Sequence, residues 1–559
     1  MQIERHFVTL DGKWGPRQVH YRRCGSGPAV LLLHQSPQSA HEYEGLMVSW
    51  AADFTVIAPD HPGYGLSDSL DTTDASLEDF ADALAEFLVA INVEKTSVYG
   101  FHTGAGMAVA LSARHPNLIS AAFANGYVVL SDSEREHILS EYLPPFVPQW
   151  DGGHLIWIWS RNRDQVIYFP WFDRRAEARM AYTLPDPQIL QRWLIEFLRA
   201  GDNYRVAYNA AFNFRGEAPL VDMQVPTIVT SVNTDVLSEH LAKITETSEQ
   251  VDVHMGGTLD ENLAEAQQFF RSNPGQKIPA PSVTESVTGQ LWNRAVPYVY
   301  GQLRVIANFD GNGEPVLLVH GAGRSAANLT PLMNALRGQR PVIALDLPGH
   351  GESDAMPDDT TFLDAVAAAL DAVLDAFGLQ HVDAWGEWGG STALIEYARR
   401  HPDRLRHIAV SGAQFFSSDE TQDLIVNYAP EIKPLSHGGH LLECWHRVRN
   451  ESLFWPWYRE ESGSVISGMP RLDAEDLTQR FLALLQSAPD QARIHRELFA
   501  YPLADSLAEN NVKILLTAAT WDPNKSHTEA AAANSQSQFV LLPDRQKDWA
   551  PTLLEFFNQ

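Results

Sequence analysis

The residues best suited to chemistry in this chain of 559 residues are His102 and Asp235. His102 is the centre of Gly100-Phe101-His102-Thr103-Gly104, which lies between an apolar run and a small-residue segment that predicts a helix. Such a glycine-flanked turn is strained and exposes its central side chain. An imidazole there could reach Asp235 and act as a general base near neutral pH or as a nucleophile. The alternative is a histidine that only fills space.

The same pattern recurs in the second half of the chain. Matching residues lie 286 positions apart: His34 and His320, Asp60 and Asp346, His102 and Trp388. A repeat of this length predicts two complete domains rather than a solenoid. Because Trp388 offers no acid, base or nucleophile, we expect the second domain to be structural or to shape the substrate site.

Short apolar runs alternate with helical segments in both halves, as in Ala29-Val30-Leu31-Leu32-Leu33. This alternation predicts an α/β fold with mostly parallel strands and helical crossovers. The stretch at 272–296 is rich in Pro and small polar residues and predicts a linker. We therefore predict a first domain at 1–271 and a second at 297–559.

Each half has an aromatic, mostly helical insertion that we predict to be a lid, at about 127–218 and about 413–505. These insertions carry candidate substrate-binding residues, namely His154, Trp159, Arg161 and Arg163 in the first half and His440 and Arg447 in the second. Arginine suits carboxylates through its bidentate fork, so an anion-binding role is one interpretation. The other is an internal salt bridge, for instance with Asp164 or Glu451.

The strands, glycine turns and late aspartates together resemble the α/β-hydrolase superfamily, twice over. The marks are the strands that end in His34-Gln35 or His320-Gly321, the segments beginning at Asp60 and Asp346, the two glycine turns and the acids Asp235 and Asp522. The resemblance implies a nucleophile elbow at residues 102 and 388 and a hydrolase lid over each sheet.

The resemblance also implies roles for single residues. Asp235 and Asp522 occupy the acid position, and the main-chain N–H groups of Gln35 and Thr103 occupy the oxyanion-hole positions. The usual loop histidine falls near Thr258 and Arg545 and is missing, so neither half carries a serine triad. His240 and His254 are the remaining candidates to replace it in the first half. The histidine at position 34 usually bridges loop backbone groups, although we also keep it as a candidate substrate contact.

Composition narrows the class of protein. The formal net charge of −29 opposes broad contact with nucleic acid or anionic membranes. No signal peptide or run of membrane-spanning length is evident, and two cysteines suit a reducing cytoplasm. We find no metal motif and no phosphate-binding glycine loop, so we expect no cofactor. The sequence leaves open whether the chain forms a homo-oligomer.

These observations predict a cofactor-independent enzyme that acts on a small carbonyl compound through a His102–Asp235 dyad. The candidate substrates are an ester, a lactone or a carbon–carbon bond flanked by a ketone, with aromatic or carboxylate-bearing molecules as options. Two alternatives remain: a lyase or isomerase that uses His102 for proton transfer, and a non-catalytic ligand-binding protein.

Overall fold

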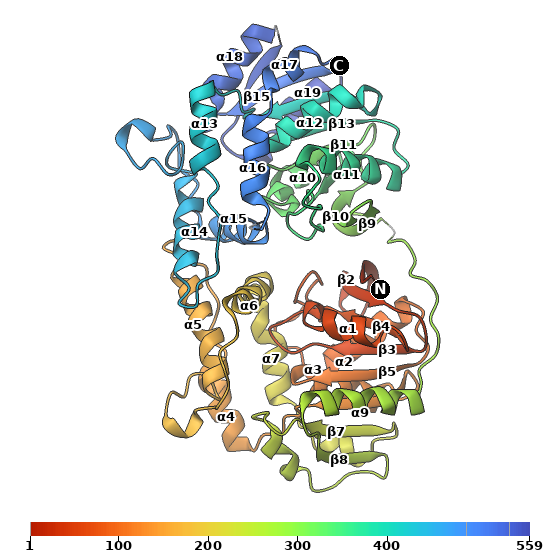
Figure 1. Cartoon of the computed structure of the whole chain (residues 1–559). Coiled ribbons are helices and arrows are strands. Elements are labelled where there is room, and N and C mark those ends of the chain that lie inside the picture. The colour runs from red at the N-terminus through yellow and green to blue at the C-terminus, as the bar shows by residue number, and fades with distance from the viewer. Residues whose placement is uncertain (1, 285, 488, 536) are drawn as a thin grey trace. The chain divides into compact units, whose positions relative to one another are not determined.

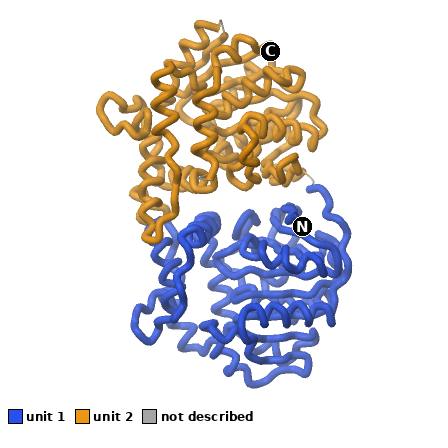
Figure 2. Tube along the Cα trace, in the orientation of Figure 1, with its two compact units in different colours: residues 1–147, 154–285 blue, residues 148–153, 286–559 orange. Residues whose placement is uncertain are grey.

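Two eight-stranded sheets organise the computed structural model, which describes residues 2–284, 286–487, 489–535 and 537–559. Each sheet belongs to one unit (Figures 1 and 2). Unit 1 contains residues 1–147 and 154–285, and unit 2 contains residues 148–153 and 286–559. The two sheets confirm the predicted fold class.

The sheet of unit 1 has the order β1-β2-β4-β3-β5-β6-β7-β8. Only the pairs β1–β2 and β2–β4 are antiparallel. The strands are β1 (Glu4–Gly12), β2 (Gly15–Cys24), β3 (Ala29–Leu33), β4 (Thr55–Pro59), β5 (Thr96–Phe101), β6 (Ile119–Asn125), β7 (Thr227–Ser231) and β8 (Val251–Met255). Every residue of β3 and β4 is buried, as expected of parallel strands covered on both faces.

Helices cover both faces of this sheet (Figure 1). One face packs against α1 (Glu44–Trp50) and α9 (Leu259–Ser272). The crossover helices α2 (Leu77–Ala90) and α3 (Thr103–Arg114) pack against each other. Ser76 begins α2 with a capping box, because its hydroxyl accepts from the Asp79 N–H and the Asp79 carboxylate accepts in return.

A helical insertion separates β6 from β7 in unit 1. It contains α4 (Asp132–Glu141), α5 (Gly153–Ile167), α6 (Pro187–Ala200), α7 (Tyr204–Asn213) and α8 (Ala218–Val221). Helix α6 has Pro187 at its start and buries Leu190, Leu194 and Phe197 at the spacing of an amphipathic helix. This insertion coincides with the predicted first lid.

Unit 2 repeats the arrangement with the order β16-β15-β14-β13-β11-β12-β10-β9. Its strands are β9 (Trp292–Tyr298), β10 (Gly301–Asn308), β11 (Val316–Val319), β12 (Val342–Leu345), β13 (Val382–Glu387), β14 (Leu405–Ser411), β15 (Lys513–Ala519) and β16 (Gln538–Leu542). Its sheet helices are α10 (Thr330–Leu336), α11 (Phe362–Ala376), α12 (Gly389–Arg400), α18 (Lys525–Ser535) and α19 (Ala550–Phe557). The insertion between β14 and β15 contains α13 (Ser418–Asn427), α14 (Gly439–Asn450), α15 (Ala474–Ser487), α16 (Gln491–Ala500) and α17 (Leu503–Ala508).

Both predicted strand–turn–helix elbows are present. His102 joins β5 to α3 with φ 49° and ψ −111°, and Trp388 joins β13 to α12 with φ 48° and ψ −116°. Positive φ is strained for residues of this kind. The flanking glycines permit the turn, because a Cβ at Gly100 or Gly104 would overlap the carbonyl oxygen of Gly104 or Leu33.

The end of the predicted linker is wrong. Residues 292–296 belong to β9, where Trp292 and Val296 are buried in the core of unit 2. Pro-rich composition marks the linker but not the strand that follows it.

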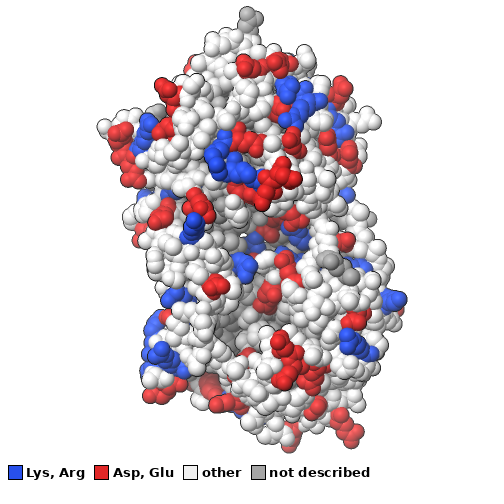
Figure 3. Space-filling model, in the orientation of Figure 1, with Lys and Arg blue, Asp and Glu red and all other residues white. Residues whose placement is uncertain are grey.

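Acidic and basic side chains are interspersed on the visible face of the molecule (Figure 3). Among the described residues, no helix is both long enough and apolar enough to span a bilayer.

Candidate active site

The structure brings His102 and Asp235 together. His102 Nε2 lies 2.8 Å from Asp235 Oδ2, across 133 residues of sequence. An ionised carboxylate only accepts hydrogen bonds, so Nε2 donates to it and Nδ1 is left as an acceptor. The His102 side chain is 29% exposed and that of Asp235 only 5%. The elbow thus holds an oriented imidazole that keeps some access to solvent.

Asp235 is itself held in place by the loop after β7. The Leu237 N–H donates to its Oδ1 at 2.8 Å. Burial raises the pKa of Asp235, but the charge and hydrogen bond of His102 and the Leu237 N–H outweigh it, so the pKa lies below its ordinary value. The carboxylate is therefore ionised at neutral pH and can stabilise an imidazolium.

A cavity of about 490 Å³ opens over this pair. His102, Thr103 and Asp235 line it together with residues of the lid and of the loops, among them Gln35, Tyr142, Asn162, Gln165 and Tyr208. Most of its lining is apolar or aromatic, which is typical of a small-molecule site with a few oriented polar groups.

The two main-chain N–H groups predicted for the oxyanion hole, those of Thr103 and Gln35, have different surroundings. Thr103 is the first residue of α3, so its N–H has no partner within the helix and is available at the cavity wall. The Gln35 N–H, in contrast, donates to Glu42 Oε1 at 2.8 Å. The prediction that Gln35 provides an oxyanion N–H is therefore wrong for this geometry, because a carboxylate already occupies that donor.

The sequence analysis missed Glu42, which lies in the short turn Ala40–Tyr43. Its Oε2 also accepts from the Gln35 side-chain amide at 3.0 Å. Burial raises the pKa of Glu42 to about 7, although the Gln35 hydrogen bonds and the nearby charge of His102 act in the opposite direction. The duplication held one signal for Glu42. Its counterpart in the second half is Asn328, so the two copies differ at this position.

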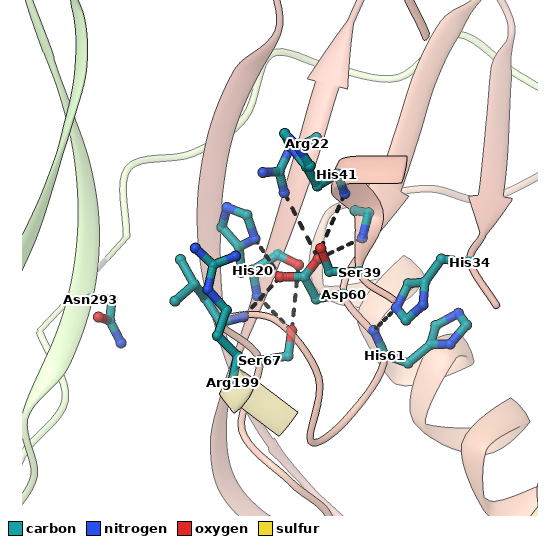
Figure 4. Close-up of polar contacts among 12 residues, drawn as sticks. His20, Arg22, His34, Ser39, His41, Asp60, His61, Ser67, Arg199 and Asn293 are labelled. Atoms are coloured by element: carbon teal, nitrogen blue, oxygen red, sulfur yellow. Dashed lines mark hydrogen bonds and ion pairs between the residues drawn. The ribbon is translucent and has the colours of Figure 1, made fainter. Parts of the chain in front are cut away.

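His34 is a structural residue, as the family resemblance implied. Its Nε2 accepts from the His61 N–H at 2.8 Å, and its Nδ1 bonds the Gln35 carbonyl at 2.9 Å. The rings of His34 and His61 stack beside each other (Figure 4). His34 is fully buried and does not line the cavity, so its assignment as a substrate contact is wrong.

Asp60 is the centre of the neighbouring polar network (Figure 4). Its carboxylate bonds His20 Nδ1 at 2.8 Å and accepts from the Ala40 and Leu66 N–H groups, each at 2.9 Å. Burial raises the pKa of Asp60, but His20 and the other contacts hold it well below its ordinary value. The Asp60 segment thus fixes the loops around the site.

The remaining substrate-binding candidates of the first lid do not reach the cavity wall. His154, Trp159 and Arg161 are buried, Arg163 is half-buried, and none of the four lines the cavity. The prediction that these residues contact the substrate directly is therefore wrong. Their neighbours on α5, Asn162 and Gln165, line the cavity instead.

Neither candidate replaces the missing loop histidine. His240 Nδ1 accepts from the Val129 N–H at 3.2 Å, and burial lowers the pKa of His240 to about 4. His254 lies on β8, where it contacts Glu265 and Asp252. The expected position, Thr258, caps α9.

The second elbow carries a tryptophan where the first carries a histidine. Trp388 Nε1 donates to Asp522 Oδ2 at 3.2 Å, and burial raises the pKa of Asp522 to about 6. The cavity beside Trp388 measures about 40 Å³. His320 bridges backbone groups like His34, and His440 Nδ1 accepts from the Leu435 N–H at 3.0 Å.

Among the residues that the structure describes, no group of three or more His, Cys, Asp or Glu side chains could hold a metal ion.

Comparison with known proteins agrees with the fold. A model of the alpha/beta hydrolase fold matches residues 28–151 and 314–433. An uncharacterized protein of Mycobacterium tuberculosis is 35% identical over 108 residues, 18% of this chain and 31% of that protein. The (E)-2-((N-methylformamido)methylene)succinate hydrolase of Acinetobacter baylyi is 28% identical over 156 residues, 28% of this chain and 54% of that enzyme.

The 2-hydroxy-6-oxo-2,4-heptadienoate hydrolase of Pseudomonas putida is 33% identical over 127 residues, 22% of this chain and 46% of that enzyme. The chain thus spans about a third to a half of the length of these curated relatives. The family model matches once in each half, on the segments that build the two sheets and elbows. The chain therefore belongs to the α/β-hydrolase fold family and contains that fold twice.

Proposed function

We propose that unit 1 is a hydrolase for a small ester, lactone or ketone-flanked carbon–carbon bond, with His102 and Asp235 in place of a serine triad. The observation that carries this proposal is the 2.8 Å contact between His102 and Asp235 at the wall of a cavity of about 490 Å³. The curated relatives named above include two hydrolases, which supports the same reaction class.

The first chemical step is proton removal. With Nε2 donating to Asp235, Nδ1 of His102 takes a proton from water, and the resulting hydroxide attacks the substrate carbonyl. Asp235 stabilises the imidazolium that forms. The Thr103 N–H, at the positive end of α3, stabilises the oxyanion.

The second step returns the proton. The tetrahedral intermediate collapses, the bond to the leaving group breaks, and the imidazolium protonates that group. Direct attack by Nδ1 on the carbonyl is the nucleophilic variant of the same scheme, in which water later hydrolyses an acyl-imidazole.

Unit 2 has no catalytic chemistry of its own in this proposal. Trp388 stands at the elbow where His102 stands in unit 1 and brings no proton-transfer group. The small volume beside it, about 40 Å³, has room for about one water molecule.

The test measures turnover of aryl esters, lactones and β-diketones by the full chain and by His102→Ala and Asp235→Asn. We expect the histidine variant to lose about 10²-fold to 10⁴-fold in kcat and the aspartate variant to lose less, because it keeps an imidazole. Wild-type turnover in His102→Ala would overturn the proposal.

Two further measurements separate the alternatives. Labelled oxygen from water enters the product of a hydrolase but not that of a lyase or isomerase. Ligands that raise the melting temperature without any turnover would indicate a binding protein.

A further inference from the structure

The first lid buries an arginine that lacks a carboxylate partner. Arg161, on α5, is 1% exposed and makes no ion pair with an acid within 4.0 Å among the described residues. Its Nη1 donates to Gln165 Oε1 at 2.9 Å, whereas Nε and Nη2 have no partner there. Five aromatic rings surround its guanidinium at 5.4 to 5.8 Å, those of Tyr142, Trp171, Phe197, Tyr204 and Tyr208.

Unit 2 contains the carboxylate that unit 1 lacks. Arg447, the counterpart of Arg161, has its Nε 3.5 Å from Glu451 Oε1, and Arg324 Nη2 lies 2.6 Å from Glu451 Oε2. The counterparts of Glu451 and Arg324 in unit 1 are Gln165 and Gln38. The duplicated helix thus keeps its buried cation in both units but its anion in only one.

This difference lies at the cavity of unit 1. Gln165 and Asn162 both line it, next to Arg161 in the sequence of α5. Asn162 is 3% exposed, and its Nδ2 has no hydrogen-bond partner in the part of the chain that the structure describes. Its counterpart in unit 2 is Val448.

The Gln165 amide is held in a fixed orientation. Arg161 binds its oxygen, and its Nε2 donates to Tyr208 Oη at 3.2 Å. Tyr208 in turn donates to the Ser36 carbonyl at 2.6 Å. One Nε2 hydrogen of Gln165 therefore remains for a ligand, since an amide nitrogen carries two.

We propose that the cavity of unit 1 takes a substrate that bears a carboxylate, which binds the Gln165 and Asn162 amides in front of the buried Arg161 charge. This inference rests on the proposed function, because it takes the cavity over His102 as the substrate site. A buried cation without a counterion is costly, and an anionic ligand supplies in unit 1 the charge that Glu451 supplies in unit 2. The aromatic rings offset only part of that cost.

The test compares two pairs of esters, and the members of each pair differ by one charge. Monomethyl succinate carries a carboxylate and dimethyl succinate does not; monomethyl and dimethyl phthalate form a second, aromatic pair. Binding is measured by calorimetric titration of the full chain carrying His102→Ala, because this substitution prevents turnover. We expect the anion of at least one pair to bind about tenfold or more tightly than its neutral partner. Equal affinities, or no binding of any of the four up to about 10 mM, would overturn the inference.

The decisive variant copies unit 2 into unit 1. Gln165→Glu places a carboxylate beside Arg161, so it should reduce the preference for the anion to less than about twofold and raise the melting temperature. Gln188→Glu makes the same charge change at an exposed position of α6 and should leave the preference intact. Full retention of the preference in Gln165→Glu would contradict the proposed site.

The two proposals fail separately. Anion-selective binding without turnover of any ester overturns the proposed function and leaves this inference standing. Turnover that depends on His102 but treats charged and neutral esters alike overturns only the inference.

Discussion

Glu42 holds the Gln35 main-chain N–H and side-chain amide with its two carboxylate oxygens, at 2.8 and 3.0 Å. This contact removes one of the two donors that the family resemblance implied for an oxyanion. The electrostatic stabilisation left at the elbow comes from the Thr103 N–H and the start of α3. Single residues therefore decide how far this site departs from a serine hydrolase.

Glu42→Gln should change how stability depends on pH. The pKa of Glu42 is raised in the folded state from its ordinary value of 4.5 to about 7, so the folded state binds more protons between these values. The contribution of Glu42 to the free energy of unfolding is therefore largest below pH about 4.5 and falls as pH rises to about 7. Glutamine removes this loss.

From pH ~5 to pH ~8 we expect the variant to gain about 2 to 3 kcal/mol relative to the wild type, measured by denaturant unfolding of the full chain. Glu136→Gln, an exposed residue of α4, is the control and should show no such trend. If the difference in the free energy of unfolding between Glu42→Gln and the wild type did not change with pH, the raised pKa of Glu42 would be contradicted.

At the scale of elements, β5 and α3 together position residue 102, which joins them. The strand is buried between β3 and β6, and the helix packs so closely on the loop after β3 that only glycine fits at its second position. The same strand–elbow–helix unit carries Trp388 in unit 2 with nearly the same backbone angles. The element is thus independent of the side chain it exposes.

Gly104→Ala should destabilise unit 1 by more than about 3 kcal/mol, because the new Cβ would overlap the Leu33 carbonyl, which is rigid backbone. Gly45→Ala is the matched control. Position 45 lies in α1 with nothing within 4 Å of the new Cβ, so it should gain about 0.5 to 1 kcal/mol from helix propensity. Thermal and denaturant unfolding measure both; equal effects would show that the elbow does not restrict this position.

At the scale of the whole molecule, the two units share a fold and differ in what fills the space under the lid. Unit 1 keeps a cavity of about 490 Å³ over His102, whereas Trp388 and the Arg324–Glu451 ion pair line a space of about 40 Å³ in unit 2. The Arg324 guanidinium lies 5.4 Å from the Trp388 ring. Side chains that unit 1 replaces by glutamines fill this region of unit 2.

Trp388→Phe should leave turnover within about twofold of the wild type, because phenylalanine keeps the apolar packing and loses only the hydrogen bond to Asp522. The same assays as for His102→Ala measure it. A loss of turnover as large as that of His102→Ala would show that unit 2 has catalytic chemistry.

The sequence by itself determined the duplication, the fold class and both elbows. These follow from local patterns, since buried strands, glycine turns and helical segments are encoded by neighbouring residues and the second copy repeats them at a fixed spacing. The sequence also identified His102 and Asp235 as possible partners, and its resemblance to a family implied that the strand-end histidines bridge loop backbone groups.

Only the tertiary structure decided which polar groups share a space. Glu42 binds Gln35, Arg161 lies among five aromatic rings behind the cavity wall, and Asn162 and Gln165 reach the cavity from α5. These outcomes depend on the rotation of helices and on contacts between distant segments, which residue type does not encode locally.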